Sequence, residues 1–202
     1  MTTADTSTAE PGRRERKKAA TRKAISNAAT ELFLERGFDA VSIREVAEKA
    51  DVSPTTVFAH FPQKEALLFY EEQGQRDRLV LAVTGRPVDS TLSDALKEYF
   101  RSEFRAMWSQ GDGALRERVM GVIGETPSLQ EYAARMWVRH EDALADAIAG
   151  EFDLTTPTNE MRLYARFALQ IQLLVASDDD PVLDEGFDLL EPGWAHYTRG
   201  LG

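Results

Sequence analysis

The fold is decided by residues 42–68, which read SIREVAEKADVSPTTVFAHFPQKEALL. This stretch contains two signals for the start of a helix. Ser42 is followed three residues later by Glu45, which is the capping-box pattern. Ser53 is followed by Pro54, and proline is favoured at the first helical position because the N–H that it lacks has no partner there. The stretch therefore predicts two short helices, each with its own N-cap.

These two helices are expected to form a compact corner with a tight connector at Asp51 and Val52. The first helix buries four apolar residues, Ile43, Val46, Ala47 and Ala50. The second ends near Phe61, because Pro62 breaks it. It is polar at Thr55 and Thr56 and apolar at Val57, Phe58 and Phe61. A short helix of this kind fits the major groove of DNA, with its N-terminal residues toward the base edges.

A longer helix is expected before the corner. It begins within RRERKKAATRK, residues 13–23, and its apolar face follows the helical spacing of Ile25, Ala28, Ala29 and Leu32. Gly37 ends this helix by supplying a left-handed residue, and Phe38 is placed for the apolar contact that accompanies such caps. Residues 13–64 are thus predicted to form a three-helix head that contains a helix-turn-helix.

Charge is distributed unevenly along the 202 residues, whose net charge is -10. The head carries 11 Lys or Arg against 7 Asp or Glu, whereas residues 65–202, the body, carry 13 against 25. A locally basic head favours binding to a polyanion such as nucleic acid. The acidic body either suppresses contact through the wrong face or is an ordinary solvated surface.

The same stretch resembles the TetR family of bacterial regulators. The resemblance runs from about Thr21 to Leu68 and includes AATELFLERGFDAVSIREVAEKADVS, the aromatic-rich second helix of the corner, and the F-P-x-K-E-A-L continuation at Phe61–Leu67. It implies an all-α protein of about nine helices: a DNA-binding head joined to a body that binds a ligand and forms a homodimer. The implied function is a transcriptional regulator, most simply a repressor that an apolar small molecule releases from a near-palindromic operator.

Carried over by position, the resemblance implies a set of residues that contact double-stranded DNA. Phosphate contacts fall on Ser42, His60 and Lys64, and base contacts on Pro54, Thr55 and Thr56; Arg44 and Phe58 complete the set. The chain departs from the family pattern at two positions. Asp51 replaces the usual glycine of the connector, and aspartate tolerates the left-handed region. Phe58 replaces the usual tyrosine, so it either packs or loses one phosphate contact.

Simpler interpretations stay open for several of these residues. Thr55 and Thr56 are alternatively exposed helix residues without a DNA contact, and His60 an ordinary surface histidine. The basic cluster Arg13–Lys18 is either a solubilising helix start or an arm that follows the DNA backbone or enters the minor groove.

Helical periodicity continues through the body. A fourth helix is expected from near Gln63 to Gly85, and a fifth from Ser90 or Thr91 through Trp108. The later helices are expected at 114–123, 127–149 and 159–177, before a last element that Pro192 and Gly193 kink or end early.

Two aromatic and methionine clusters in the body are candidates for a ligand pocket. Such stripes are more often core, but the helices at these positions surround an apolar cavity in the family that the head resembles. The candidate ligand-binding residues are Phe104, Met107, Trp108, Tyr132, Met136, Trp137 and Phe167.

The eighth helix is apolar on nearly all sides from Met161 to Val175, so two of its faces need cover. One face can meet the body's own core, and the other implies a second copy of the chain. The candidate dimer-interface residues are Phe167, Leu174, Phe187 and Trp194. Two further readings remain: a DNA-binding regulator that takes no ligand, and a ligand-binding protein whose head does not engage DNA.

Several classes of protein are not expected. The chain has no cysteine, its three histidines (His60, His140, His196) are dispersed, and no phosphate loop, HExxH or nucleophile elbow occurs. No enzyme activity, metal or cofactor is therefore predicted. The longest apolar stretch, Leu163–Ala176, is interrupted and too short to span a bilayer. Residues 1–12 are predicted to be a disordered tail rather than a secretory signal, and the location to be cytoplasmic.

Overall fold

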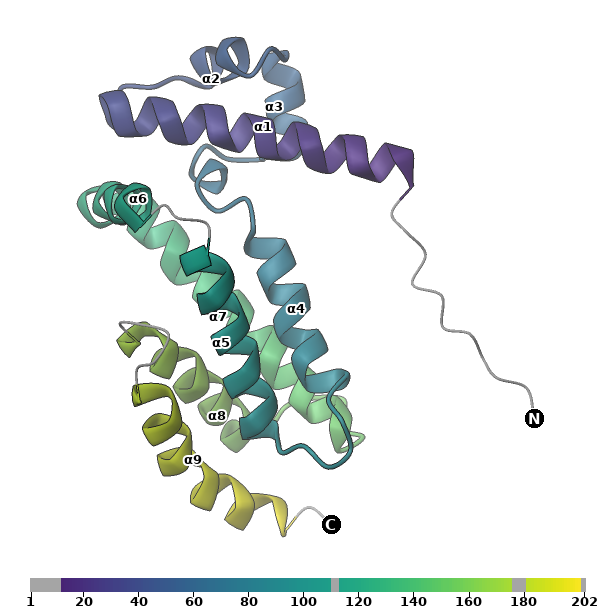
Figure 1. Ribbon diagram of the computed structural model, residues 1–202. Coiled ribbons are helices and arrows are strands. Elements are labelled where there is room, and N and C mark those ends of the chain that lie inside the picture. Colours follow the sequence, from purple (N-terminus) through teal and green to yellow (C-terminus); the bar gives the residue numbers. More distant parts are fainter. Residues whose placement is uncertain (1–11, 110–112, 176–180, 201–202) are drawn as a thin grey trace. The chain divides into compact units, whose positions relative to one another are not determined.

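The computed structural model describes residues 12–109, 113–175 and 181–200, and these residues contain helices and no strand (Figure 1). The predicted all-α class and the number of helices are confirmed. The helices are α1 Arg13–Arg36, α2 Ile43–Lys49, α3 Pro54–His60, α4 Glu72–Thr84, α5 Leu92–Ser109, α6 Gly113–Glu125, α7 Pro127–Glu151, α8 Asn159–Ile171 and α9 Val182–Thr198. The tail predicted for residues 1–12 lies outside the described residues, apart from Gly12.

The chain divides into two compact units. The first contains the described residues up to Tyr70 together with Gly121–Thr126, and the second contains the remainder, beginning at Glu71. The first unit thus continues past Lys64, where we expect the head to end. The reason is a buried contact: the Ser26 hydroxyl on α1 donates to the carbonyl oxygen of Leu67 at 2.7 Å.

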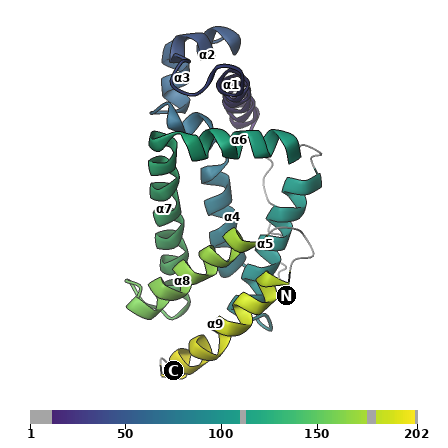
Figure 2. The same ribbon diagram turned by 90° about the vertical axis from the view of Figure 1, so that its left-hand side faces the viewer.

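The core of the first unit lies where α2 packs on α1 and α3 packs on α2 (Figure 2). The two short helices have seven residues each and cannot be stable alone, so this packing holds them. Phe33 and Phe38 meet at a centroid distance of 4.9 Å, which is the apolar contact expected beside Gly37. The buried side chains are Ile25, Ala28, Ala29, Phe33, Phe38, Val41, Val46, Ala47, Val57, Phe61, Ala66 and Leu67.

The second unit is a bundle built around α4, α5, α7, α8 and α9. Helix α4 packs against α5 and α7, whereas α8 packs against α7 and α9 (Figure 2). Helix α8 is strongly amphipathic and not apolar on nearly all sides, as we expect from the sequence, because Arg162 and Arg166 lie on its outer side. Its inner face contains Met161, Tyr164, Ala165, Ala168 and Leu169. The largest buried side chains around it are Phe100, Leu144, Ile148 and Phe187.

Two predicted helix boundaries are wrong, the start of the fourth helix and the end of the eighth. The fourth helix begins at Glu72 rather than near Gln63, because residues 65–67 form a 3₁₀ turn whose Ala66 and Leu67 are buried in the first unit. The eighth helix ends at Ile171, and a 3₁₀ turn at 172–174 follows it. The SDDDP segment predicted after it, residues 177–181, lies outside the described residues except for Pro181.

The last helix is not ended early by Pro192, since α9 continues to Thr198. Proline removes one backbone hydrogen bond, the one to the carbonyl of Asp188. Asp188 and Pro192 are both exposed, so water can take the place of the missing donor. The helix therefore tolerates the proline.

Helix α9 lies close against Ile171 of α8 at Gly186. A Cβ atom added to Gly186 would lie 2.8 Å from two carbon atoms of Ile171. Such a separation is not compatible with van der Waals packing, so the Ile171 side chain or one of the two helices would have to shift. Glycine is required here for packing and not for an unusual backbone angle.

Replacing Gly186 with alanine is expected to destabilise the protein by about 1–3 kcal/mol through overpacking. The measurement is the free energy of unfolding from urea denaturation. Gly193→Ala on the same helix is the matched control, because its added methyl meets no atom within 4 Å. Gly193→Ala is expected to stabilise the protein by about 0.5–1 kcal/mol, since alanine has a higher helix propensity than glycine at an exposed position. Equal effects of the two substitutions would contradict the packing explanation.

Candidate functional site

The start of α2 is fixed by the capping box that the sequence predicts. The backbone N–H of Ser42 donates to Glu45 Oε2 at 2.8 Å, and the Glu45 N–H donates back to Ser42 Oγ at 3.3 Å. The bonds that the Ser42 N–H and hydroxyl donate to the carboxylate, together with an ion pair with Arg36 (2.7 Å), lower the pKa of the Glu45 carboxyl to about 2. The Ser42 hydroxyl also donates to Glu45 at 2.8 Å. Both donors of Ser42 are thus already used within the protein.

The connector between α2 and α3 is a Schellman motif with Asp51 in the left-handed position. The Val52 N–H donates to the Ala47 carbonyl (3.0 Å) and the Asp51 N–H to that of Glu48 (3.2 Å). The φ angle of Asp51 is 52°. The corner therefore forms with aspartate in place of the expected glycine.

Helix α3 begins at Pro54 and presents an exposed face. Ser53 caps it by accepting from the Thr56 N–H at 3.1 Å, and the Ser53 and Thr56 hydroxyls are hydrogen-bonded to each other at 2.8 Å. Pro54 and Thr55 are exposed, and the side chain of Phe58 is 53% exposed. Phe58 thus does not take the packing role that we considered for it. No acidic residue occurs from Val52 to Lys64, so this face lacks negative charge.

The end of α3 is held by Arg22 of α1, a residue that the sequence analysis does not identify. Its Nη1 donates to the carbonyl oxygen of His60, its guanidinium lies 4.2 Å from the centre of the Phe61 ring, and its Nε donates to the Tyr70 carbonyl at 3.4 Å. No local pattern in the sequence connects positions 22 and 60. Arg22 is a positioning residue for α3.

His60 is half-buried beside this guanidinium. Its Nδ1 is buried and has no hydrogen-bond partner among the described residues. Burial, together with the nearby charges of Arg22 and Lys18, lowers the pKa of the imidazole. His60 is therefore neutral at neutral pH in the unbound protein.

Lys64 points into the first unit. Its Nζ donates to the carbonyl oxygen of Phe38 at 2.6 Å and lies 4.2 Å from the centre of that residue's ring. Partial burial lowers the pKa of the ammonium group. Lys64 thus links the end of the corner to the end of α1, and only part of its hydrogen-bonding capacity is left for another partner.

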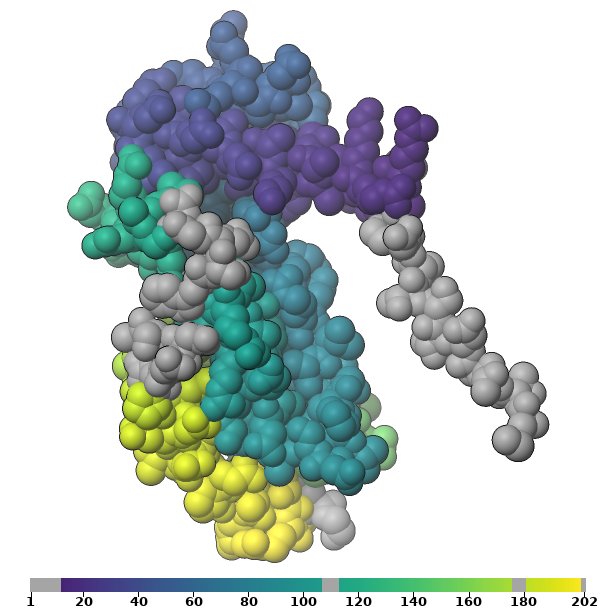
Figure 3. Space-filling view, viewed as in Figure 1, coloured from purple at the N-terminus to yellow at the C-terminus, as the bar shows by residue number. Residues whose placement is uncertain are grey.

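Two other sources of positive charge are exposed on the first unit. Arg44 is exposed on α2, and within the described residues no hydrogen bond or ion pair holds its guanidinium. The basic cluster Arg13–Lys18 forms the exposed first turns of α1, whose side chains stand out from the surface in Figure 3 (purple).

A separate cavity of about 310 Å³ lies inside the second unit. Two of the predicted ligand-binding residues, Phe104 and Trp137, line it. The other lining residues are Gln75, Leu79, Tyr99, Phe100, Glu103, Arg116, Met120, His140, Leu169, Gln172, Leu173 and Val175. The sequence indicates Phe104 and Trp137 of this wall, but it does not identify Tyr99, Phe100, His140 or Gln172.

Three of the other predicted ligand-binding residues do not line this cavity, and the side chains of the last two are not among those that the structure describes. Tyr132 and Met136 are buried elsewhere, and the Tyr132 hydroxyl donates to Glu72 at 2.7 Å. Phe167 is 50% exposed on α8. Met107 and Trp108 belong to the last turns of α5, and their side chains lie outside the described residues.

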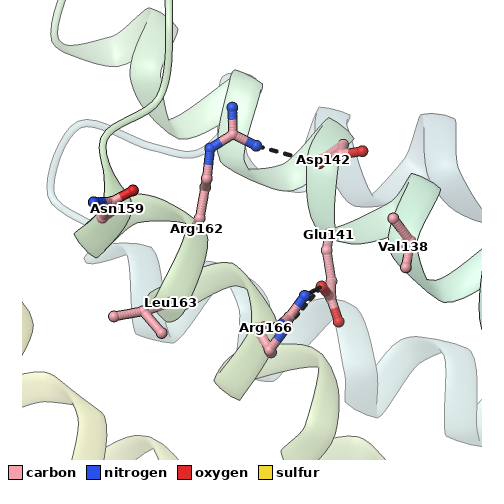
Figure 4. A pocket seen from close by; sticks show the side chains of 7 residues that line it. All are labelled: Val138, Glu141, Asp142, Asn159, Arg162, Leu163 and Arg166. Atoms are coloured by element: carbon pink, nitrogen blue, oxygen red, sulfur yellow. Dashed lines mark hydrogen bonds and ion pairs between the residues drawn. The ribbon is translucent and has the colours of Figure 1, made fainter.

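A hollow of about 420 Å³ between α7 and α8 is lined by charged residues (Figure 4). Arg162 pairs with Asp142 at 3.3 Å and Arg166 with Glu141 at 2.8 Å, so α8 reaches α7 through two ion pairs. This wall does not suit an apolar ligand, because such a ligand would cover paired charges without replacing their interactions with water.

The four candidate dimer residues have different surroundings. Phe167 and Leu174 are exposed, at 50% and 70%. Trp194 is half-buried and packs on Tyr164 at a centroid distance of 4.6 Å. Phe187 is fully buried in the core of the second unit, so its side chain is not available to a partner, and we correct the candidate set by removing it.

Within the described ranges, no cluster of three or more His, Asp or Glu side chains is arranged to hold a metal ion. No helix in the described part of the chain combines the length and the hydropathy that a membrane span needs.

A helix-turn-helix with an acid-free second helix, followed by a helical unit with a cavity, defines a helix-turn-helix regulatory protein. Comparison with known proteins gives the family. The family described as "Bacterial regulatory proteins, tetR family" matches residues 25–70. The chain belongs to this family of transcriptional regulators, which agrees with our expectation that it is not an enzyme.

Two relatives and one solved structure illustrate the similarity. The regulator TcmR of Streptomyces glaucescens is 32% identical over 143 residues, covering 69% of this chain and 63% of TcmR. The repressor BdcR of Escherichia coli (strain K12) is 32% identical over 145 residues, covering 69% of this chain and 70% of BdcR. The structure of a SmeT–triclosan complex is 18% identical, covers 84% of this chain and 91% of SmeT, and has a TM-score of 0.54. For TcmR and several other relatives, the region that aligns with this chain spans less than two thirds of the relative's own length.

Replacing Asp51 with glycine is expected to stabilise the first unit by up to about 1 kcal/mol. Aspartate is strained at a φ of 52°, whereas glycine adopts this conformation freely, and only part of the gain is offset by the entropy of the unfolded chain. Thermal unfolding followed by circular dichroism checks this. Asp51→Val is the opposite control, since a β-branched residue in this region should destabilise the unit. A destabilised glycine variant would contradict the assignment of strain.

Proposed function

We propose that this chain is a repressor that binds a near-palindromic operator as a homodimer and is released when an apolar small molecule occupies the second unit. One observation carries the proposal: the same chain combines an exposed, acid-free α3 face with a largely apolar cavity in a separate unit. Binding of DNA and binding of a ligand would thus occur at distinct sites, as allosteric release requires. A cytoplasmic location is part of this proposal, because the operator would lie on the chromosome.

The exposed face of α3 supports reading of bases by Pro54, Thr55 and Phe58. A threonine hydroxyl can bond to a base edge, and an apolar side chain can contact the methyl group of thymine. The half-exposed Phe58 ring is suited to the second role. Thr56 contributes less to base reading, since its hydroxyl is already bonded to Ser53.

The residues that contact phosphate differ from those that the family resemblance alone implies. Arg44 and the cluster Arg13–Lys18 are exposed and cationic, so they take the larger share. Lys64 and His60 contribute from the rim of α3, whereas Ser42 would first have to release Glu45. Neutral His60 would donate a hydrogen bond to a phosphate oxygen.

The cavity supports an apolar effector. Its wall is mainly aromatic and aliphatic, and pockets of roughly 300–1,000 Å³ hold small molecules in proteins. BdcR is named a repressor, and SmeT was solved with triclosan. A coupling of about 1–3 kcal/mol between the two sites would change operator affinity roughly 5- to 150-fold. A regulator without a ligand would instead keep full operator affinity in any ligand screen.

Exposed apolar side chains on and after α8 support a homodimer. Leu163, Phe167, Leu173 and Leu174 are each at least half exposed. A two-fold pair would present two α3 helices to successive major grooves about 34 Å apart. The proposed interface therefore includes Phe167 and Leu174, with Trp194 at most at its edge.

The operator and its release are tested by selecting bound DNA from random sequence and then screening small molecules for release. The selected sites are expected to be near-palindromic. Thr55→Ala should change the preferred bases, whereas Arg44→Ala should weaken binding to all sites and lower the salt slope by about one. Failure of the purified protein to bind any DNA at low salt would favour a head that does not engage DNA. Equal losses across all sites for both variants would contradict the division of roles.

Phe167→Glu is expected to convert the dimer into a monomer, because a buried, unpaired carboxylate is costly at an apolar interface. Light scattering at micromolar concentration measures this, together with loss of operator binding. Val88→Glu is the matched control, since Val88 is fully exposed between α4 and α5. An unmodified chain that is already monomeric would refute the dimer.

A further inference from the structure

Two polar atoms in the residues that line the cavity have no hydrogen-bond partner. They are Nδ1 of His140 and Nε2 of Gln172, and both are buried. Buried polar atoms in proteins are almost always paired, because leaving one unpaired costs free energy. Two such atoms around one cavity therefore point to a polar group on the molecule that occupies it.

The fold fixes the orientation of the His140 ring. The side chain is 3% exposed, and the ring packs on Trp137 at a centroid distance of 5.4 Å. Its Nε2 lies 3.3 Å from the carbonyl oxygen of Glu72. A carbonyl oxygen only accepts, so Nε2 carries the hydrogen in this contact.

The free nitrogen of His140 is therefore a hydrogen-bond acceptor. Burial lowers the pKa of the imidazole, and Arg76 and Arg139 lower it further, whereas the Glu72 carbonyl and carboxylate only partly oppose this, so the ring is neutral at neutral pH. A neutral imidazole with its hydrogen on Nε2 has a lone pair on Nδ1. The group that pairs with Nδ1 must be a donor, such as an O–H or N–H.

Gln172 supplies the complementary function. Its Nε2 is a donor without a partner, and the residue begins the 3₁₀ turn that follows α8. The side chain is half-buried, and the residue belongs to the lining of the cavity. A hydroxyl group can donate to one of the two side chains and accept from the other.

Three other polar residues of the wall, Tyr99, Glu103 and Arg116, already interact within the protein. Glu103 pairs with Arg78 at 2.7 Å, and the Tyr99 hydroxyl donates to the carbonyl of Gln75 at 3.1 Å. Arg116 also takes part in an interaction within the protein. No unpaired charge at these residues calls for an ion, and the aromatic rings of Tyr99, Phe100, Phe104 and Trp137 suit a flat apolar molecule.

We propose that the effector is a neutral aromatic molecule with a hydroxyl group that donates to Nδ1 of His140 and accepts from Nε2 of Gln172. This rests on the proposed function, in which the cavity takes the effector. The aromatic rings of the wall supply most of the contact area, and the two polar side chains select the hydroxylated molecule.

The test is calorimetric titration of the purified full chain, without DNA, with three probes: naphthol, methoxynaphthalene and naphthoate. Methoxynaphthalene keeps the ring system but lacks the donor, and naphthoate carries a charge. Naphthol is expected to bind about tenfold more tightly than methoxynaphthalene, the effect of one hydrogen bond to an otherwise unpaired group. Equal affinities, preference for naphthoate, or no binding of naphthol would overturn the proposal.

Substitutions locate the effect. His140→Phe removes the acceptor and should abolish the preference for naphthol, whereas Phe104→Leu should weaken naphthol and methoxynaphthalene alike and keep their ratio. If His140→Phe does not fold, two other measurements test the hydroxyl contact. They are naphthol binding by Gln172→Met and imidazole nitrogen NMR of the unmodified chain. Naphthol should shift the Nδ1 resonance of His140 as a hydrogen bond forms, and an unchanged resonance would overturn the proposal.

Failure of this proposal is separable from failure of the proposed function. Naphthol that binds through His140 but does not release the operator would support the hydroxyl contact and remove the repressor mechanism. Release of the operator by methoxynaphthalene and naphthol at equal concentrations would support the mechanism and refute the hydroxyl contact.

Discussion

The contact of Arg22 with the end of α3 is the constraint on which the helix-turn-helix depends. Helices of seven residues are too short to be stable in isolation, so their orientation has to come from the long helix beneath them. Arg22 provides it through a carbonyl oxygen and an aromatic face, neither of which has a negative charge. The guanidinium therefore keeps its positive charge beside the end of α3.

Those parts of the head that depend on neighbouring residues could be predicted from the sequence. The caps at Ser42 and Ser53 and the left-handed turn at Asp51 involve residues within five positions of each other, and all three form. The start of α4 could not be predicted in this way. It depends on burial of Leu67 against α1, which is a contact between residues far apart in the chain.

The candidate sites show the same division. Phe104 and Trp137 could be selected because aromatic residues at helical spacing face inward, and both line the cavity. His140 and Gln172 carry no such signal, since a single polar residue on a helix is usually exposed. Their importance appears only when the partner of each polar atom is known. Inward-facing Lys64 is a further example, because its bond to the Phe38 carbonyl has no sequence pattern.

The contact between Gly186 and Ile171 has a consequence for how this body can diverge. Positions 171 and 186 occupy one shared volume, so a larger residue at one requires a smaller residue at the other. Ile171 directly precedes Gln172, which lines the cavity. Paired changes at these two positions would therefore shift a cavity residue without altering the cavity's own composition. Related proteins could acquire new ligand preferences by this route while keeping the same lining residues.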